Sequence, residues 1–225
     1  MKDNSITLET LVSGIRGPKI IMIGSRPGMG KTFLSLIMAI RMAFNMGKSV
    51  TFFSLEMSNE ALLRRISKIS DLCPEDIQNS LLNIIDNPYL SFLELEQTIK
   101  NKYNEKKIEA VFIDYLGLLD YKNSCESQYK HQTQMIIKLK ALANKLNIPI
   151  IILLALRRNS EGPFPQLVHS TISAAEAFQC IDQFLIFQIS ETKKNIIKAY
   201  VHNRNKNNSW TKEVLLWSYQ DLLSS

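Results

Sequence analysis

Short apolar runs alternate with longer amphipathic stretches along most of this sequence. The apolar runs are Lys19–Ile23, Val50–Ser54, Leu82–Asp86, Ala110–Asp114 and Ile148–Leu154. The stretches with apolar residues at helical spacing are Lys31–Met46, Asn59–Ile69, Leu93–Tyr103 and Gln128–Leu146. Strands that alternate with helices are typical of an α/β fold with a parallel sheet covered on both faces. The last of these runs is the most apolar, so we expect it at the centre of the sheet.

The pattern changes after Arg157, where a loop rich in Ser, Gly and Pro begins. Three β-like runs follow with little helix between them, namely Gln183–Ile189, Ile196–His202 and Glu213–Trp217. This order predicts an antiparallel C-terminal edge on an otherwise parallel sheet. Because 225 residues with 45% hydrophobic content suffice for one sizeable core, we expect a single domain over residues 1–225.

A glycine-rich motif lies between the first predicted strand and the first predicted helix. The segment Gly24–Thr32 reads GSRPGMGKT and matches G-x-x-x-x-G-K-[ST], the P-loop. Its backbone N–H groups and the following helix N-terminus suit phosphates, Lys31 would reach the β- and γ-phosphates, and Thr32 would ligate Mg²⁺. We therefore predict ATP and Mg²⁺ as cofactors. The predicted nucleotide-binding residues of this segment are Gly24, Ser25, Arg26, Pro27, Gly28, Met29, Gly30, Lys31, Thr32 and Phe33.

Two acidic residues follow predicted strands and are candidates for the same site. Asp114 ends an apolar run, as does the Walker B acid that holds the Mg²⁺ shell in P-loop enzymes. Glu56 lies just beyond Val50–Ser54, where it could polarise the attacking water. From its position alone, Glu56 is better interpreted as an exposed acid that caps the next helix.

These motifs together resemble the RecA-like motor domain of the DnaB-type hexameric replicative helicases. The segments that carry the resemblance are Gly24–Thr32, Phe53–Met57, Ile113–Leu116, Leu139–Ala143 and Asn147–Ile150. The resemblance implies a P-loop ATPase that acts on single-stranded DNA as a homo-oligomer, a hexamer in that family, together with replication proteins. It also implies that the helical N-terminal domain and most of the linker of such helicases are absent from this sequence.

The resemblance carries three further roles onto residues of this sequence. Glu56 in Ser-Leu-Glu-Met becomes the catalytic base, and Arg65 becomes a residue near the nucleotide base. The family's K-x-R pair falls on His202-Asn-Arg204, so Arg204 becomes an arginine finger that completes the site of a neighbouring subunit.

The sequence departs from the family pattern at three places. The family's Y-L-Q-L contains Gly117 here, the polar sensor after the central strand is Ala155, and the D-L-R-x-S-G stretch reads Ser170–Ala175 without arginine. Gln179 or Gln183 could replace the sensor. The residues that could replace the lost DNA-binding cation are Arg157, Arg158, Lys193 and Lys194. Two hypotheses therefore stand, an ATP-hydrolysing motor and a degenerate accessory module that binds nucleotide and acts through protein partners.

Composition adds little to this choice. The net charge of +6 favours a polyanionic partner, but the mixed charge clusters could equally be a solvated face. The three cysteines and three histidines lack metal-ligand or disulfide spacing, which favours a reducing, cytoplasmic location. The longest apolar stretch, Ile148–Leu156, contains a proline and is shorter than a bilayer span, so we expect no membrane insertion.

Overall fold

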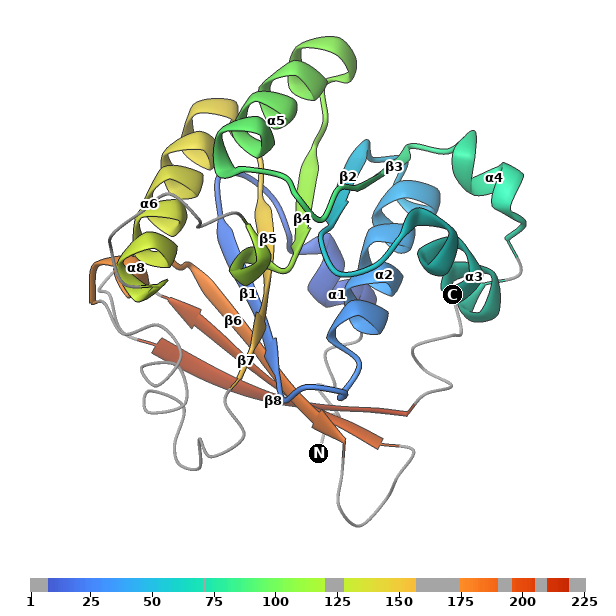
Figure 1. Cartoon of the computed structure of the whole chain (residues 1–225). Coiled ribbons are helices and arrows are strands. Elements are labelled where there is room, and N and C mark those ends of the chain that lie inside the picture. Colours follow the sequence, from blue (N-terminus) through green and yellow to red (C-terminus); the bar gives the residue numbers. More distant parts are fainter. Residues whose placement is uncertain are drawn as a thin grey trace.

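The computed structural model describes residues 8–70, 72–119, 128–156, 175–189, 196–204 and 210–218. Its centre is an eight-stranded sheet with the order β3-β2-β4-β5-β1-β6-β7-β8 (Figure 1). The strands are β1 (Ile20–Ser25), β2 (Val50–Ser54), β3 (Leu82–Asp86), β4 (Ala110–Asp114), β5 (Ile150–Ala155), β6 (Gln183–Ile189), β7 (Ile196–Arg204) and β8 (Trp210–Ser218). Every predicted strand is present, and β5 lies inside the sheet between β4 and β1, as predicted.

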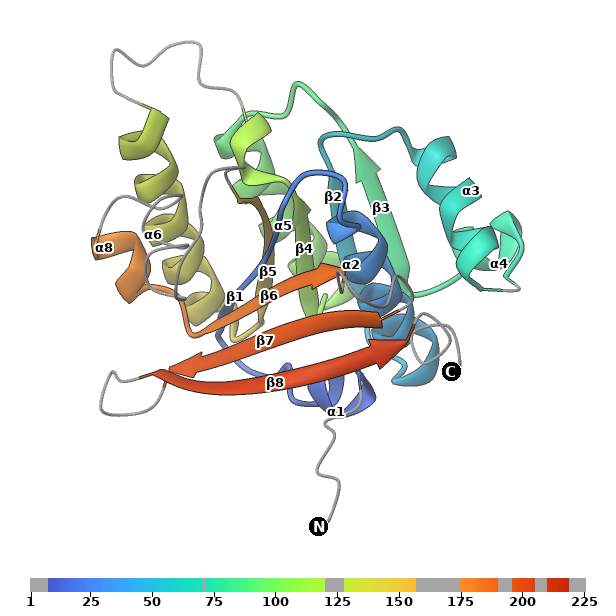
Figure 2. The same cartoon turned by 90° about the horizontal axis from the view of Figure 1, so that it is seen from below.

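The sheet is parallel from β3 to β6 and antiparallel beyond β6. Strand β6 pairs in parallel with β1, whereas β7 runs antiparallel to β6 and β8 antiparallel to β7. Figure 2 shows the long β7–β8 ribbon crossing the base of the molecule. The predicted antiparallel C-terminal edge is confirmed.

Helices cover both faces of the sheet. The α-helices are α1 (Leu8–Ser13), α2 (Lys31–Ile40), α3 (Asn59–Ile69), α4 (Pro74–Gln78), α5 (Phe92–Lys106), α6 (Gln128–Leu146) and α8 (Ala175–Gln179). A π-helical segment, Arg41–Asn45, extends α2, and a 3₁₀ turn, Leu116–Leu118, follows β4. The sequence did not predict α1, α4 or α8, because five or six residues are too few to carry a helical period.

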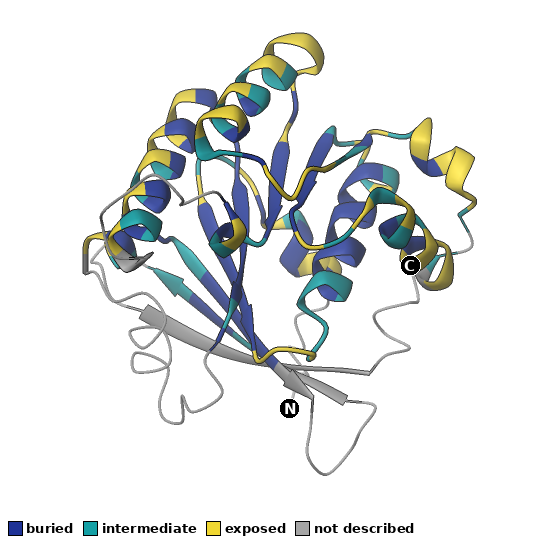
Figure 3. Ribbon diagram, viewed as in Figure 1, coloured by how far each residue is buried: buried dark blue, intermediate teal, exposed yellow. Residues whose placement is uncertain are grey.

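Two apolar cores lie between these layers. Helices α1–α4 pack on one face of the sheet and helices α5, α6 and α8 on the other (Figure 1). In β5, Ile151 and Leu153 enter the first core while Ile150 and Ile152 enter the second, as the period of a strand requires. Figure 3 shows the central strands as the most buried part of the described chain.

This topology places the carboxyl ends of the parallel strands together at one end of the sheet. Because the P-loop follows β1 there, this end is called the P-loop edge below. The last residues there are Ser25, Ser54, Asp86, Asp114 and Ala155. In open α/β sheets, ligands bind outside the carboxyl ends of the strands, so this edge is where a site is expected.

Candidate nucleotide-binding site

The loop between β1 and α2 turns on two glycines with left-handed backbone. Gly28 has φ 79° and Gly30 has φ 88°, conformations that side chains other than glycine rarely adopt. Gly30 directly precedes α2, and its carbonyl accepts the first helical bond, from Leu34 N–H at 3.0 Å. The N–H groups of the first turn of α2 have no partner within the helix, which is the arrangement that binds phosphate.

Some side chains of this loop pack against the core, and others are exposed to solvent. Met29 and Phe33 are half-buried and pack against the core between the sheet and helices α1–α4. Ser25 is buried, and its hydroxyl donates to the Arg26 carbonyl at 3.1 Å. Arg26, Pro27 and Gly28 are exposed. The loop therefore rests on the core and presents its exposed residues outward.

Gly24, the first residue of the P-loop, packs against the end of β5. A Cβ added there would lie 3.4 Å from the Leu156 side chain, in ordinary contact, so Gly24 fits closely under the residue that follows β5. Leu156 N–H also donates to the Ser25 carbonyl at 2.9 Å. The P-loop strand is thus fixed against the end of the central strand.

Thr32 and Asp114 meet although 82 positions separate them in the sequence. The Thr32 hydroxyl donates to Asp114 Oδ2 at 2.6 Å, and Asp114 is completely buried at the end of β4. Its other oxygen, Oδ1, is buried and has no hydrogen-bond partner among the described residues. A buried carboxylate oxygen that lacks a partner costs free energy unless something binds it.

A divalent cation fits this pair. Mg²⁺ takes oxygen ligands and is held in nucleotide sites by one or two protein oxygens together with phosphates and water. Within the part of the chain that the structure describes, no group of three His, Cys, Asp or Glu residues could hold a metal alone. The Thr32 hydroxyl and Asp114 Oδ1 could therefore hold Mg²⁺ only jointly with a phosphate ligand.

The electrostatics of Asp114 identify its neighbours. Burial raises the pKa of its carboxyl group, and the negative charge of Glu56 raises it further. The hydrogen bond from Thr32 and the positive charges of Lys31 and Arg65 act in the opposite direction and lower this pKa. These residues, predicted from separate parts of the sequence, are close enough for their charges to act on one carboxylate.

Tyr115 belongs to the same environment. Burial, Glu56 and Asp114 together raise the pKa of its phenol. A Cβ at residue 117 would lie 2.6 Å from Tyr115 Cε2, so Gly117 leaves the room that this ring occupies.

Glu56 is exposed in the turn between β2 and α3. Leu55 N–H donates to the Asp114 carbonyl at 2.7 Å, which ties this turn to the end of β4. The N-cap of α3 is Ser58, whose hydroxyl accepts the Ala61 N–H at 3.3 Å. Glu56 is therefore not the N-cap acid of α3, and that alternative interpretation is wrong.

Arg204 ends β7 near the amino end of β1, whereas this cluster lies at the carboxyl end of β1. Its N–H donates to the Asp182 carbonyl at 2.9 Å, and Asp182 N–H donates to the carbonyl of Ile20, the first residue of β1. The P-loop begins at Gly24, near the other end of β1, roughly 13 Å from Ile20 at ~3.3 Å per residue. The Arg204 guanidinium donates to the Gln179 carbonyl. The structure thus does not bring Arg204 to the P-loop of its own chain.

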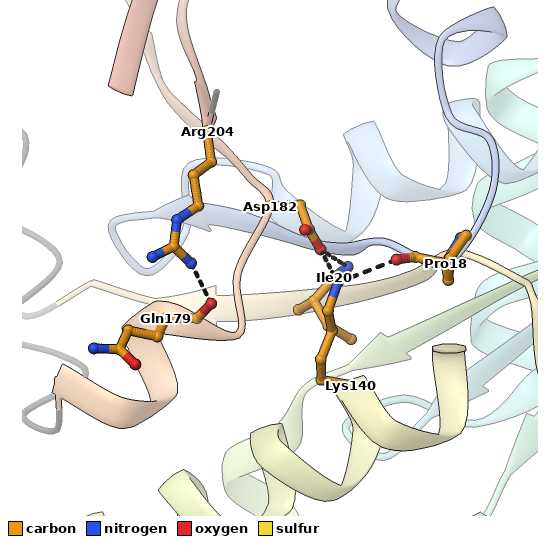
Figure 4. A network of polar contacts seen from close by, with 6 residues as sticks. All are labelled: Pro18, Ile20, Lys140, Gln179, Asp182 and Arg204. Carbon is orange, nitrogen blue, oxygen red and sulfur yellow. Dashed lines mark hydrogen bonds and ion pairs between the residues drawn. The ribbon is translucent and has the colours of Figure 1, made fainter. Parts of the chain in front are cut away.

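A polar cluster fixes this amino end of the sheet. Asp182 Oδ2 accepts both Lys140 Nζ and the Ile20 N–H, each at 2.7 Å, and Lys140 Nζ also donates to the Pro18 carbonyl at 3.1 Å (Figure 4). Helix α6, β1 and β6 are joined here. Sequence reasoning missed Lys140 and Asp182; the only available signal was a lone acid directly before an apolar run.

Ala155 lies at the P-loop edge, but neither proposed replacement for it does. In β1, Ser25 pairs with Ala155, whereas Ile21 pairs with Gln183 near the amino end. The Gln183 side chain donates to Asn203 Oδ1 at 2.6 Å, and Gln179 precedes β6 at the same end. The hypothesis that Gln179 or Gln183 replaces the sensor is therefore wrong, because each lies at the wrong end of the sheet.

Several predicted DNA-contact residues lie outside the described residues. They are Arg157, Arg158, Lys193 and Lys194. The segment 170–174, where the family's arginine is missing, also lies outside the described residues. Ala175 begins α8. Among the described residues, no helix is long and apolar enough to cross a membrane.

The fold and this site define a P-loop nucleotide-binding domain of the RecA-like class. The sequence matches the family described as the DnaB-like helicase C terminal domain over residues 2–73 and 66–167. The chain therefore belongs to that family. It is 32% identical to the replicative DNA helicase DnaB of Treponema pallidum (strain Nichols) over 218 residues, which cover 87% of this chain and 50% of the relative.

Other relatives agree with this assignment. The replicative DNA helicase DnaB of Helicobacter pylori (strain 26695) is 30% identical over 179 residues, which cover 70% of this chain and 36% of the relative. The chain thus spans half or less of the length of these two curated relatives.

Solved structures share the fold. A solved structure described as an ATPase domain matches with a TM-score of 0.71 and 23% identity, covering 88% of this chain and 80% of that one. A DnaB-like replicative helicase, described with its interactions with primase, matches with a TM-score of 0.74 and 22% identity, covering 91% of this chain and 58% of that one.

Proposed function

We propose that this chain is the ATP-hydrolysing motor domain of a DnaB-type replicative helicase, acting on single-stranded DNA as a homo-oligomer. The observation that carries the proposal is the 2.6 Å bond between the Thr32 hydroxyl and Asp114, beside an unpartnered buried carboxylate oxygen. A P-loop enzyme that hydrolyses ATP needs this hydroxyl and this acid side by side.

Each residue of the cluster has a distinct task in this proposal. The backbone N–H groups of Gly28, Gly30 and Lys31 bind the phosphates, and the Lys31 ammonium neutralises the charge between the β- and γ-phosphates. Thr32 and Asp114 hold Mg²⁺, which when bound offsets charge on the phosphate oxygens. Arg65, which lies on α3, would lie near the nucleotide base in this proposal.

Glu56 is the general base of the proposed reaction. Its carboxylate accepts a proton from the attacking water as the bond between this water and the γ-phosphorus forms and the bond to the β-phosphate oxygen breaks. Its exposure at the P-loop edge, and its electrostatic effect on Asp114, support this role.

The remaining parts of the proposal concern other molecules. Arg204 completes the site of a neighbouring copy, which is supported by its position at the far end of β1 from its own P-loop. Single-stranded DNA and replication proteins are the proposed partners, supported by membership of the family and by the excess of six positive charges.

Phosphate release by the whole chain with Mg²⁺ and ATP tests the function. We expect Lys31→Ala to lose tight ATP binding, because the phosphates lose their closest fixed cation. Glu56→Gln should bind ATP but turn over about 10²–10⁴-fold more slowly. Lys68→Ala and Glu60→Gln, which change exposed residues of α3, are the matched controls. A chain that binds Mg·ATP but releases phosphate no faster than its Glu56→Gln variant would instead be a nucleotide-binding regulatory module.

A further inference from the structure

One buried hydroxyl closes the turn that carries Glu56. Ser54 is the last residue of β2 and is 1% exposed. Its hydroxyl donates to the Met57 carbonyl at 2.6 Å and accepts the Met57 N–H at 3.2 Å. Both main-chain groups of the residue after Glu56 are therefore held by the same side chain.

Two more bonds fix the main chain on either side. Leu55 N–H donates to the Asp114 carbonyl at 2.7 Å, and Asn59 N–H donates to Asp86 Oδ2 at 2.6 Å. The turn is thus attached to the carboxyl ends of β4 and β3, the neighbours of β2 in the sheet. Because one of these bonds ends on Asp114 itself, the main chain next to Glu56 is fixed directly to the proposed magnesium ligand.

The Glu56 side chain has no such support of its own. Within the described residues, its carboxylate forms no hydrogen bond or ion pair, and it is exposed. The main chain of the turn therefore sets the direction in which the Glu56 side chain leaves the backbone. Of the bonds that set this turn, those of Ser54 are the ones made by a completely buried side chain.

We propose that Ser54 is a positioning residue for Glu56. The proposal rests on the proposed role of Glu56 as general base. The Ser54 hydroxyl holds residues 54–57 in one closed turn, so that the Glu56 carboxylate faces the P-loop when ATP is bound. A displacement of about 1 Å at a reacting group can lower a rate by as much as ~10²-fold.

The first test separates turnover from binding. Ser54→Ala is expected to lower kcat by about 10–100-fold. The KM and the Kd for Mg·ATP should stay at the parent values, because Lys31, Thr32 and Asp114 are untouched. Ser54→Thr keeps the hydroxyl and should recover most of kcat. Ser54→Cys, which keeps a γ atom but is only a weak hydrogen-bond donor and acceptor, takes the place of the alanine variant if that variant does not fold.

Ser80 supplies a matched control. Its hydroxyl also donates to a carbonyl (Ile77, 2.7 Å) and accepts an N–H (Leu82, 3.0 Å), but it lies before β3, at the other end of the sheet. Ser80→Ala should therefore lower stability by a similar amount and leave kcat unchanged. An equal loss of kcat in both serine variants would mean a general structural effect and would overturn the proposal.

A double variant tests whether Ser54 acts through Glu56. Ser54→Ala combined with Glu56→Gln should be no slower than Glu56→Gln alone, because no base remains to be positioned. Losses that multiply, or a Ser54→Ala variant with the parent kcat, would overturn the positioning role and leave the proposed function standing. If Glu56→Gln itself keeps the parent kcat, both the general base and this inference are wrong.

Discussion

At the scale of single residues, Asp114 is the most informative side chain of the site. It is completely buried, and within the described part of the chain one of its oxygens lacks a partner. Burial and Glu56 together raise its pKa. The folded chain therefore binds a proton at Asp114 more tightly than the unfolded chain does. Stability then falls as the pH rises from the ordinary carboxyl range of about 4 through the raised pKa.

Because the ionised Asp114 carboxylate lowers stability at neutral pH, we predict that Asp114→Asn stabilises the protein there. The same variant should abolish hydrolysis. The amide keeps an acceptor for Thr32 and removes the cost of a buried charge. Urea unfolding without Mg²⁺ or nucleotide, at a series of pH values, measures the effect. The advantage of the variant over the parent should be present at neutral pH and shrink toward pH ~4.

Asp86→Asn is the control for this prediction. Asp86 is exposed at the end of β3, on the far side of β2 from Asp114, and its carboxylate accepts the Asn59 N–H, so its replacement should give no gain in stability. An Asp114→Asn variant less stable than the parent at neutral pH would show that the buried carboxylate is not the source of the cost.

At the scale of secondary-structure elements, Lys140 joins α6 to the base of the sheet. We predict that Lys140→Met, which keeps much of the apolar stem, lowers the free energy of unfolding by about 1 kcal/mol, because it removes bonds to Asp182 and to the Pro18 carbonyl. Lys100→Met is the matched control. Its ion pair with Glu96 is comparably exposed but lies within one helix, so its loss should cost about 0.3–0.5 kcal/mol. Urea unfolding measures both variants. If they lose the same free energy of unfolding, Lys140 does not contribute to stability by joining α6 to the sheet.

The elements themselves were largely predictable from sequence, and their relation in space was not. Strand β2 and helix α3 match the predicted bounds because apolar period, flanking turns and an N-cap serine agree there. The P-loop, Glu56 and Asp114 could be expected at one end of the sheet because Asp114 ends one parallel strand and Glu56 lies two residues beyond the end of another. The hypothesis that Gln183 replaces the sensor was wrong because the sequence alone did not establish which end of β6 lies beside Ser25. The bonds of Ser54 and Asp182 depend on folded geometry, and no sequence period indicates them.

At the scale of the whole molecule, the position of Arg204 predicts hydrolysis that depends on assembly. An arginine finger delivered by a neighbour is worth on the order of 10³–10⁵ in turnover. Specific activity should therefore rise with protein concentration. A mixture of Lys31→Ala, which keeps Arg204, and Arg204→Ala, which keeps its own P-loop, should be more active than either alone. Flat specific activity on dilution, with full activity in Arg204→Ala, would dispose of the trans role.

The second prediction at this scale is that single-stranded DNA stimulates hydrolysis weakly. Ala155 lies opposite Ser25 at the P-loop edge, and its side chain cannot form the hydrogen bonds that would report the γ-phosphate. Ala155→Gln should raise the ratio of DNA-stimulated to basal turnover, and the half-exposed position leaves room for the larger side chain. Ala155→Met controls for size. Strong, saturable stimulation of the parent chain in an oligonucleotide titration at low salt would contradict this expectation.

The placement of Arg204 and the P-loop at opposite ends of β1 has a consequence for symmetry. A copy that gives its arginine from one end and receives one at the other favours contacts through two different surfaces, which is a heterologous, head-to-tail interface. In an open row of copies joined in this way, the terminal copy receives no arginine and its site stays incomplete. Closure into a ring is the arrangement in which every site is completed. Hydrolysis per subunit would then measure ring closure. In a linear pair, one of the two sites receives an arginine, so the activity per subunit could reach only half of that in a closed ring.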